Sequence, residues 1–502
     1  MSFPCSEAAL VSRRSFLGAL ALVLAAPAVQ AEDGNRLATL IASELGQFAS
    51  FVQGAGGRVG ACFLDVETGI ELGSLAANVP ENPASNAKLV TAGAALAKLG
   101  AEFVFTSGLY GGIEDGRVPN LVLRSDGDPS LTSADLALLA SALRERGVRE
   151  VGDVLVDQSA HDERYVPPAF EQQPDEWAAF RAPVSAVAVD RNSVTVTISP
   201  TTRGSDARVT FEPEGFVETE GHIDTVAPKK PAQPLAGLAA RGTRLVAKLG
   251  GSISEGVAPL RYRQRVDDPR LFPAYALRSA LATVGIAVSG TLRLGGASET
   301  RELALHRSRP LNELLPELGK SSDNFYAEMI LKALGAKAKG VPATSAAGAE
   351  LATAWLREIG AFEPGVRVNN GSGLYDSNRL TPRALTRLLA AARRDPVISA
   401  DFMNQLAVGG VDGTLKLRFK KLAAGRTLVA KTGTLRDVVA LSGFVSAPEQ
   451  RHPVAFSLIV SGVNGKTPLV RKRLDLLIER IADELTRAAV APLPQPLSAA
   501  SG

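Results

Sequence analysis

Apolar positions in the first hundred residues follow two periodicities, one typical of helices and one of strands. Residues 36–54 have a helical pattern. Residues 59–74, VGACFLDVETGIELGS, form two apolar runs around turn residues 67–69, which predicts a β-hairpin. An Ala/Leu-rich segment bracketed by Pro83 and Gly100 predicts a second helix.

The pattern changes between residues 105 and 300, where short strands mix with few helices. One amphipathic helix is expected to start near Thr132 or Ser133, and another to end at Gly285. SVTVTISP and ARVTFEPEG alternate between apolar and polar residues, as antiparallel strands with one exposed face do. This region therefore differs in character from what precedes it.

The last third of the chain returns to compact helices and strands. Helices are predicted at 321–335, 344–360 and 468–488, and strands at 427–434, 438–447 and 452–463. The simplest assembly pairs the first hairpin with these strands, giving an antiparallel sheet of about five strands covered by the first and last helices. The predicted fold class is α/β (α+β), with the middle of the chain inserted and residues 491–502 as a flexible tail.

The composition of the chain narrows the classes of protein to which it can belong. The chain has 502 residues, too many for one ordinary domain, and 45% of them are hydrophobic, enough for sizeable cores. The net charge is only +3, and no basic stripe with interleaved aromatic residues occurs, so nucleic-acid binding is not expected. After the N-terminus no stretch reaches the roughly 18 apolar residues of a membrane-spanning helix, so no transmembrane segment is expected.

The N-terminus has the pattern of an export signal. Arg13 and Arg14 precede a short apolar run, and Val29 and Ala31 suit a cleavage site. The arginine pair before Ser-Phe-Leu resembles a twin-arginine signal, although a general secretory signal with two arginines is the alternative. We expect residues 1–31 to be removed near Ala31 and the mature protein to be periplasmic. Cys62 then has no cysteine partner and is expected to be a buried core residue.

Three short motifs each occur once and in a fixed order. They are Ser-x-x-Lys at Ser85–Lys88, Ser-Asp-Asn at Ser322–Asn324, and Lys-Thr-Gly-Thr at Lys431–Thr434. Any one of them is weak, but the ordered trio is the signature of penicillin-binding proteins and class A β-lactamases.

The chemistry of these residue types explains the trio. A serine hydroxyl such as that of Ser85 needs a base, and Lys88 lies one helical turn away on the same face. Lys88 can act as that base only if burial and a nearby cation such as Lys431 lower its pKa. Ser322 can relay a proton to a leaving amine, and Asn324 can offer an amide to a substrate backbone.

The Lys-Thr-Gly-Thr stretch suits a substrate that ends in a carboxylate. Lys431 supplies positive charge from an edge strand, and Thr432 and Thr434 add hydroxyl donors beside Gly433.

Other catalytic classes lack their motifs. No histidine has a metal-ligand spacing, so no metal site is expected, and the histidines are interpreted as surface or loop residues: His161, His222, His306 and His452. G-x-S-x-G is absent, and the GKS and GKT triplets lack the first glycine of a phosphate-binding loop. No cofactor is therefore expected.

With these motifs in place, the chain resembles the class C penicillin-binding proteins, the D-alanyl-D-alanine carboxypeptidase/endopeptidase (serine peptidase S13) family. Further blocks such as RSDGDPSLT, NGSGLYDSNRLTPRAL and GGVDGTLKLR support the likeness over nearly the whole mature chain. The long separation of Ser85 from Ser322 fits the family's inserted domains. One departure is Asn370, where many relatives have aspartate, and asparagine keeps the turn-forming ability.

The resemblance implies a fold and a domain division. It implies a transpeptidase-like domain with an antiparallel sheet flanked by helices, interrupted by two smaller domains. The expected segments are 32–110 and 299–490 for the catalytic domain, 111–189 and 266–298 for domain II, and 190–265 for a β-rich domain III.

The resemblance also implies an activity. The substrate would be a peptidoglycan peptide ending in D-Ala-D-Ala, with Ser85 as nucleophile and β-lactams as covalent inhibitors. The oxyanion hole would be formed by the backbone N–H groups of Ser85 and Thr434, with Thr432, Gly433 and Thr434 binding the substrate. Asp162 is the candidate for binding the amine of a diaminopimelate side chain, and an ordinary loop aspartate is the alternative.

Two alternatives remain open from the sequence. One is a β-lactamase or esterase of the same fold, and the other is a non-catalytic peptidoglycan-binding protein. Between Asn324 and Lys431 there is no E-x-x-L-N stretch of the kind that carries a deacylating glutamate, which favours the peptidase. Protein partners and oligomeric state are not predicted.

Overall fold

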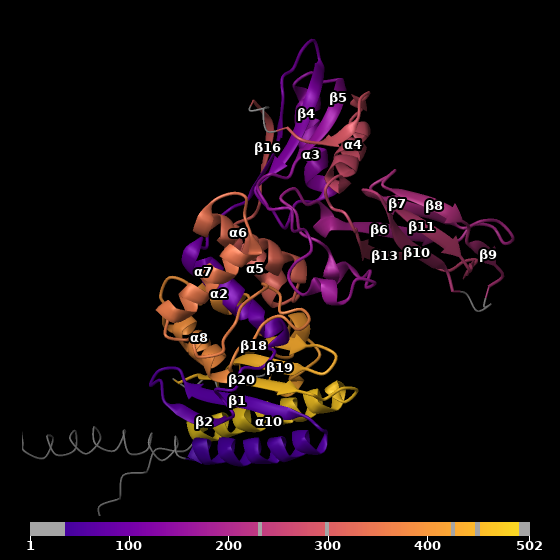
Figure 1. The fold of residues 1–502 in the computed structure, drawn as a ribbon. Coiled ribbons are helices and arrows are strands. Elements are labelled where there is room, and N and C mark those ends of the chain that lie inside the picture. The colour runs from indigo at the N-terminus through magenta and orange to yellow at the C-terminus, as the bar shows by residue number, and fades with distance from the viewer. Residues whose placement is uncertain (1–35, 229–232, 297–300, 423–426, 447–451, 491–502) are drawn as a thin grey trace, which may run out of the picture.

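The structure is a computed structural model that describes residues 36–228, 233–296, 301–422, 427–446 and 452–490 (Figure 1). The predicted signal peptide, 1–31, and the predicted tail, 491–502, lie outside the described residues. None of the helices in the described ranges is long and apolar enough to cross a bilayer.

A six-stranded antiparallel sheet joins the two ends of the described chain. Its strand order is β17-β18-β19-β20-β1-β2, so the N-terminal hairpin pairs with the C-terminal meander as predicted. Short β17 adds an edge strand that the sequence pattern did not predict. The strands are β1 (Arg58–Asp65), β2 (Glu71–Leu75), β17 (Ala407–Val408), β18 (Thr427–Thr434), β19 (Val439–Ser446) and β20 (Val454–Ser461).

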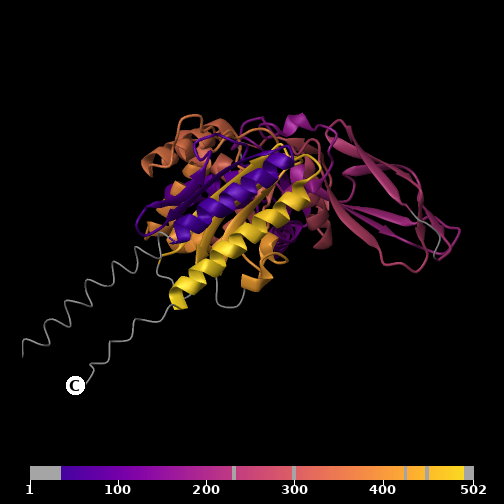
Figure 2. The same cartoon turned by 90° about the horizontal axis from the view of Figure 1, so that it is seen from below.

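Helices cover both faces of this sheet. Residues 36–54 and α10 (Thr467–Val490) lie side by side on one face (Figure 2). On the other face α8 (Pro382–Arg394) packs directly on the strands. The core on this face also includes residues of α2 (Ala87–Lys98), α5 (Leu311–Gly319), α6 (Asn324–Lys339), α7 (Ser345–Glu358) and α9 (Ser399–Asn404).

Strand β19 shows how the two cores arise. Val439, Leu441 and Val445 point to the side of the terminal helices, and Ala440 and Phe444 point to the other. Side chains alternate between the faces of a strand, so a strand with buried apolar side chains on both faces must be covered on both sides. The sheet is therefore the middle of three layers.

A second six-stranded sheet is formed mainly by the inserted region. Its path is β14-β5-β4-β3-β16, and β15 also pairs with β5. Its strands are β3 (Thr106–Tyr110), β4 (Arg117–Ser125), β5 (Glu150–Asp157), β14 (Ala287–Val288), β15 (Leu292–Leu294) and β16 (Glu302–Arg307). Its core includes α3 (Ser133–Glu145) and α4 (Phe272–Thr283), which start and end close to the predicted positions.

This sheet bears on the predicted domain boundaries. Strands β3 and β16 lie inside the segments assigned to the catalytic domain, yet both pair in the second sheet. The boundaries at 110 and 299 therefore do not follow the edges of the sheets, and the division into domains stays a prediction.

Residues 193–265 form small sheets that project to one side (Figure 1). They contain β6 (Ser193–Ser199), β7 (Arg208–Glu212), β8 (Val217–Gly221), β9 (Asp224–Val226), β10 (Leu235–Arg241), β11 (Arg244–Gly250), β12 (Ser252–Ser254) and β13 (Leu260–Arg265). Short 3-10 helices connect elements elsewhere: η1 (Ala84–Asn86), η2 (Phe170–Gln172), η3 (Ala179–Arg181), η4 (Asp190–Asn192), η5 (Gly413–Leu415) and η6 (Lys420–Leu422).

Candidate active site

Ser85 lies in η1, the 3-10 turn that leads into α2. It is half-buried, whereas Lys88 on the first turn of α2 is completely buried. The next residue, Asn86, donates a 2.7 Å hydrogen bond from Nδ2 to Oγ of Ser442 on β19. This bond fixes the turn to the central sheet and so fixes the position of Ser85.

The amino group of Lys88 has three neighbours. Its Nζ lies 3.0 Å from Oγ of Ser85, 2.8 Å from Oδ1 of Asn324 and 2.8 Å from the carbonyl oxygen of Ser372. The amide and carbonyl oxygens can only accept hydrogen bonds, whereas a hydroxyl can also donate one. A neutral Lys88 would therefore give its two hydrogens to these acceptors and direct its lone pair at the Ser85 hydroxyl.

The Ser-Asp-Asn motif sits at the start of α6. Ser322 has a left-handed backbone, φ 60°, and its Oγ accepts a 2.7 Å hydrogen bond from Nζ of Lys431. Nδ2 of Asn324 donates to the carbonyl oxygen of Phe180 at 3.0 Å, which leaves Oδ1 of Asn324 for Lys88. The inserted region, which supplies Phe180, thus helps to orient this motif.

Strand β18 carries the third motif past the serine turn. A Cβ atom on Gly433 would lie 2.9 Å from the carbonyl oxygen of Pro83, so only glycine allows the strand to come this close. Oγ1 of Thr432 donates to Thr414 at 2.9 Å, and Oγ1 of Thr434 accepts from Arg471 at 3.3 Å.

Burial changes the proton affinity of both lysines. It lowers the pKa of Lys88 to about 7, although the negative charges of Glu328 and Asp323 act in the opposite direction. Burial and the charge of Lys88 hold the pKa of Lys431 well below its ordinary value. A substantial fraction of Lys88 is then neutral near pH 7, as a general base requires.

A cavity of about 890 Å³ opens in front of these groups. Its walls include Ser85, Ser322, Asn324 and Thr434, so the structure brings together residues of all three motifs. Charged side chains of both signs surround them: Arg58, Glu81, Glu176, Asp376, Arg379, Arg436 and Asp437.

Asp162 is not among the residues that line this cavity. It forms an ion pair with Lys332 of α6, which is almost completely buried. Asp162 lines a separate cavity of about 1120 Å³, which has Gln172 and Asp376 in common with the first. A substrate ammonium group could reach Asp162 only from this second cavity and in competition with Lys332.

The loop that supplies the Ser372 carbonyl had no predicted role in the site. A Cβ atom on Gly373, whose φ is +73°, would collide with the carbonyl oxygen of Ala84, so the loop packs directly on the serine turn. Asn370 is buried, and its Oδ1 accepts from the backbone N–H of Gly373 at 2.9 Å. The sequence signal for this loop was the run of glycines around Ser372.

The histidines differ from the prediction in one case. His161 is buried, not at the surface, and burial lowers its pKa to about 3. It follows β5 and packs against Gly127, where a Cβ atom would lie 2.6 Å from its Nε2. No local pattern indicated this contact, because Gly127 lies far from His161 along the chain.

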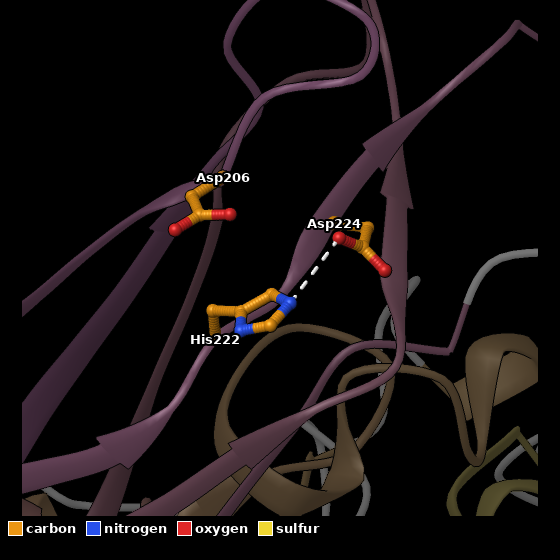
Figure 3. A group of neighbouring side chains, drawn as sticks. All are labelled: Asp206, His222 and Asp224. Carbon is orange, nitrogen blue, oxygen red and sulfur yellow. Dashed lines mark ion pairs between the residues drawn. The ribbon is translucent and has the colours of Figure 1, made fainter.

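One group of side chains has the composition of a metal site. Asp206, His222 and Asp224 each have a ligand atom within 4.8 Å of the others, and all three are exposed (Figure 3). His222 and Asp224 lie two residues apart, and Asp206 pairs with Asp224 through an isolated bridge. The group belongs to the region of small sheets, and its residues are not among those lining the Ser85 cavity.

Comparison with known proteins identifies the family. A model of the D-Ala-D-Ala carboxypeptidase 3 (S13) family matches residues 49–481. The chain belongs to this family. The family is one of serine peptidases, so the family and the enzyme class expected from the motifs are both confirmed.

Two bacterial relatives cover most of this S13 chain. A D-alanyl-D-alanine carboxypeptidase of Actinomadura sp. (strain R39) is 33% identical over 487 residues, covering 92% of this chain and 88% of the relative. The D-alanyl-D-alanine carboxypeptidase DacB of Haemophilus influenzae is 26% identical over 393 residues, covering 76% and 80%.

Solved structures confirm the predicted fold class. Penicillin binding protein 4 (dacB) from Haemophilus influenzae superposes with a TM-score of 0.73 at 22% identity, covering 86% of this chain and 99% of that one. The same protein complexed with a β-lactam gives a TM-score of 0.67. This chain and the Haemophilus influenzae protein therefore have the same fold.

Proposed function

We propose that this chain is a serine D-Ala-D-Ala carboxypeptidase/endopeptidase that cleaves peptidoglycan stem peptides through an acyl-enzyme on Ser85. The observation that carries the proposal is the bonding of Lys88. Two obligate acceptors take its hydrogens, so that its lone pair faces the Ser85 hydroxyl.

In the first half of the reaction, neutral Lys88 removes the proton of Ser85, and Oγ attacks the carbonyl carbon of the penultimate D-alanine. Negative charge develops on the carbonyl oxygen, and we propose the backbone N–H groups of Ser85 and Thr434 as its donors. The C–N bond then breaks. The terminal amine leaves with the proton from Lys88, relayed through Ser322, and an ester remains on Ser85.

In the second half, water replaces the amine. Lys88, neutral again, takes a proton from the water molecule, whose oxygen attacks the ester carbon. The C–O bond breaks, the proton passes to Oγ of Ser85, and the shortened peptide leaves as a carboxylic acid. The same steps hydrolyse a cross-link when the leaving amine belongs to a neighbouring peptide.

Lys431 suits the substrate's carboxylate for an electrostatic reason. In the empty site its positive charge is disfavoured by burial and by Lys88. A bound carboxylate provides the opposite charge, so Lys431 becomes fully charged as the substrate binds. Hydroxyl groups of Thr432 and Thr434 lie on the same strand and add donors for that carboxylate.

Inhibition by β-lactams follows from the same site. A β-lactam resembles the terminal dipeptide, and attack by Ser85 opens its ring while the amine stays attached to the acyl group. The amine cannot diffuse away, so it obstructs the approach of water. We therefore expect slow loss of the adduct.

Mass spectrometry after incubation with penicillin tests the assignment. The wild-type protein should gain the mass of one penicillin, and Ser85→Ala should gain none while remaining folded. Ser321→Ala, an exposed serine beside the second motif, is the matched control and should label like the wild type. Labelling of Ser85→Ala at the wild-type rate would disprove the assignment of Ser85 as the nucleophile.

A comparison of turnover separates the peptidase from the β-lactamase alternative. The same preparation is given a D-Ala-D-Ala peptide and a chromogenic cephalosporin. We expect repeated cleavage of the peptide and stalled turnover of the cephalosporin. Fast cephalosporin turnover without peptide cleavage would favour a β-lactamase.

We further propose that the protein acts in the periplasm. The support is the arginine pair and short apolar run within residues 12–31. Its proposed substrate, the cell-wall peptide, lies on that side of the inner membrane.

A further inference from the structure

Glu328 is a buried acid on α6 to which the steps above give no role. It lies one helical turn after Asn324 and one turn before Lys332, so the three side chains follow one face of the helix. Glu328 is 0% exposed. A carboxylate in such a place is costly unless hydrogen bonds and positive charges compensate it.

The backbone of the glycine-rich loop supplies those hydrogen bonds. The N–H of Gly371 donates to Oε2 of Glu328 at 3.1 Å, and the N–H of Ser372 donates to Oε1 at 2.8 Å. One carboxylate therefore holds two successive peptide groups. Because two adjacent N–H groups of the loop are held, the carbonyl group of Ser372 has little freedom to rotate.

That carbonyl is an acceptor of the catalytic lysine. The N–H of Ser372 donates to Glu328, and the carbonyl oxygen of Ser372 accepts from Nζ of Lys88 at 2.8 Å. Thr91 of α2 also donates to the carbonyl of Gly371 at 2.8 Å. The loop thus bridges α6 and α2, and Glu328 fixes the acceptor that orients Lys88.

Charges around this pair come from several elements. Lys88 is influenced by Glu328 and Asp323, both of which favour its protonated form. Lys431 on β18 feels the repulsion of Lys88, and Lys332 feels the attraction of Glu328. Burial raises the pKa of Glu328, while its hydrogen bonds and the charge of Lys88 act against that rise. Glu328 thus interacts electrostatically with two buried lysines, Lys88 and Lys332.

We propose that Glu328 is a positioning residue for the reaction: its carboxylate holds the Gly371–Ser372 peptide so that Lys88 aims its lone pair at Ser85. Through its charge, Glu328 also sets the pH at which Lys88 becomes a base. The inference rests on the proposed function, because it assigns Glu328 a part in the chemistry of Ser85.

The substitution Glu328→Gln separates these roles from simple packing. The amide keeps the size of the side chain, but its NH2 faces one of the two backbone N–H donors, and its negative charge is lost. Loss of an opposite charge beside Lys88 lowers the lysine's pKa further. The variant should therefore acylate more slowly at its optimum, yet keep its activity to lower pH.

The measurement is the second-order rate of acylation by a fluorescent penicillin from pH 5 to pH 9. The acid limb of the wild type should lie near pH 7, the pKa of Lys88. In Glu328→Gln we expect the acylation rate to rise about one pH unit lower than in the wild type, and its maximum to be about tenfold lower. Glu358→Gln, on the exposed end of α7 where it pairs with Lys98, is the matched control and should leave both unchanged.

Two results would overturn the inference. A folded Glu328→Gln protein whose acid limb stays at the wild-type pH would leave Glu328 a structural residue only. If that variant does not fold, Glu328→Asp is measured instead, which keeps the charge but shortens the reach. For Glu328→Asp, slower acylation with the acid limb at the wild-type pH supports the proposal, because the charge is kept and only the reach is shortened. Acylation of Glu328→Asp at the wild-type rate refutes it.

Failure of the proposed function would look different. In that case the wild-type protein itself would not be acylated at any pH.

Discussion

Gly433 lies where the third motif passes the serine turn, and adding one methyl group there should disturb the reaction more than the fold. In Gly433→Ala the new Cβ would lie 2.9 Å from the carbonyl oxygen of Pro83 and 3.1 Å from Cβ of Ala84. Ordinary van der Waals contact begins near 3.4 Å. Strand β18 and η1 must therefore move apart by roughly half an ångström.

The size of the effect follows from what sits next to Gly433. Thr434 and Ser85 are the proposed oxyanion donors, and they belong to the two elements that would separate. Misplacement on this scale should lower the acylation rate roughly tenfold to a hundredfold. Crowding of this kind should cost the fold about 1–3 kcal/mol.

The assay combines penicillin acylation with thermal unfolding, and the chain offers a matched control. Gly237 on β10 is also a strand glycine, but the nearest atom to a Cβ there is 4.0 Å away. Gly237→Ala should leave both acylation and stability close to wild type. Acylation of Gly433→Ala at the wild-type rate would show that close approach of β18 to η1 is not needed.

Three further predictions follow from the same structure. Acylation of the wild type should rise through pH 7 and level off above it, because Lys88 must lose its proton; a rate that is constant from pH 5 upward would exclude Lys88 as the base. Asp162→Asn should lower the free energy of unfolding by about 3 kcal/mol in chemical denaturation, because it leaves the buried Lys332 without this ion-pair partner. Adding Lys332→Met to that variant should recover part of the loss. Equal stability of Asp162→Asn and the wild type would contradict this. Replacement of Arg13 and Arg14 by lysine should leave uncleaved precursor in the cytoplasm, as judged by fractionation, whereas normal export would point to the general secretory route.

The central sheet was predictable because its strands have strong local signals. Strands β1 and β20 are mostly apolar over eight residues and lie in a hairpin and a meander with clear turn residues, so the two ends of the chain could be assigned to one sheet. The edge strand β17 has two residues and no pattern of its own. Its pairing with β18 depends on tertiary contact, which a periodicity analysis cannot detect.

The active site was predictable as far as its motifs reach. Ser85, Lys88, Ser322, Asn324, Lys431 and Thr434 are short-range patterns, and the structure gathers them at one cavity or in direct contact with it. Glu328 was missed, although a lone acid in the apolar run FYAEMIL, one turn after Asn324, was a usable signal. The partner of Asp162 could not be foreseen, because Lys332 is far away in sequence and its burial depends on the packing of α6.

The pairing of β1 with β20 also determines when the enzyme becomes reactive. Arg58 pairs with Ser461, so β1, the strand that precedes Ser85, cannot complete its pairing until β20, the last strand that the structure describes, has been made. During synthesis, Ser85 and Lys88 emerge long before Asn324 and Lys431 exist to orient them. Closing so long a loop is slow, so we expect Ser85 to remain an ordinary, unreactive serine until the chain is complete. A penicillin label on Ser85 would therefore count the molecules whose two ends have met, which makes it a direct measure of finished folding.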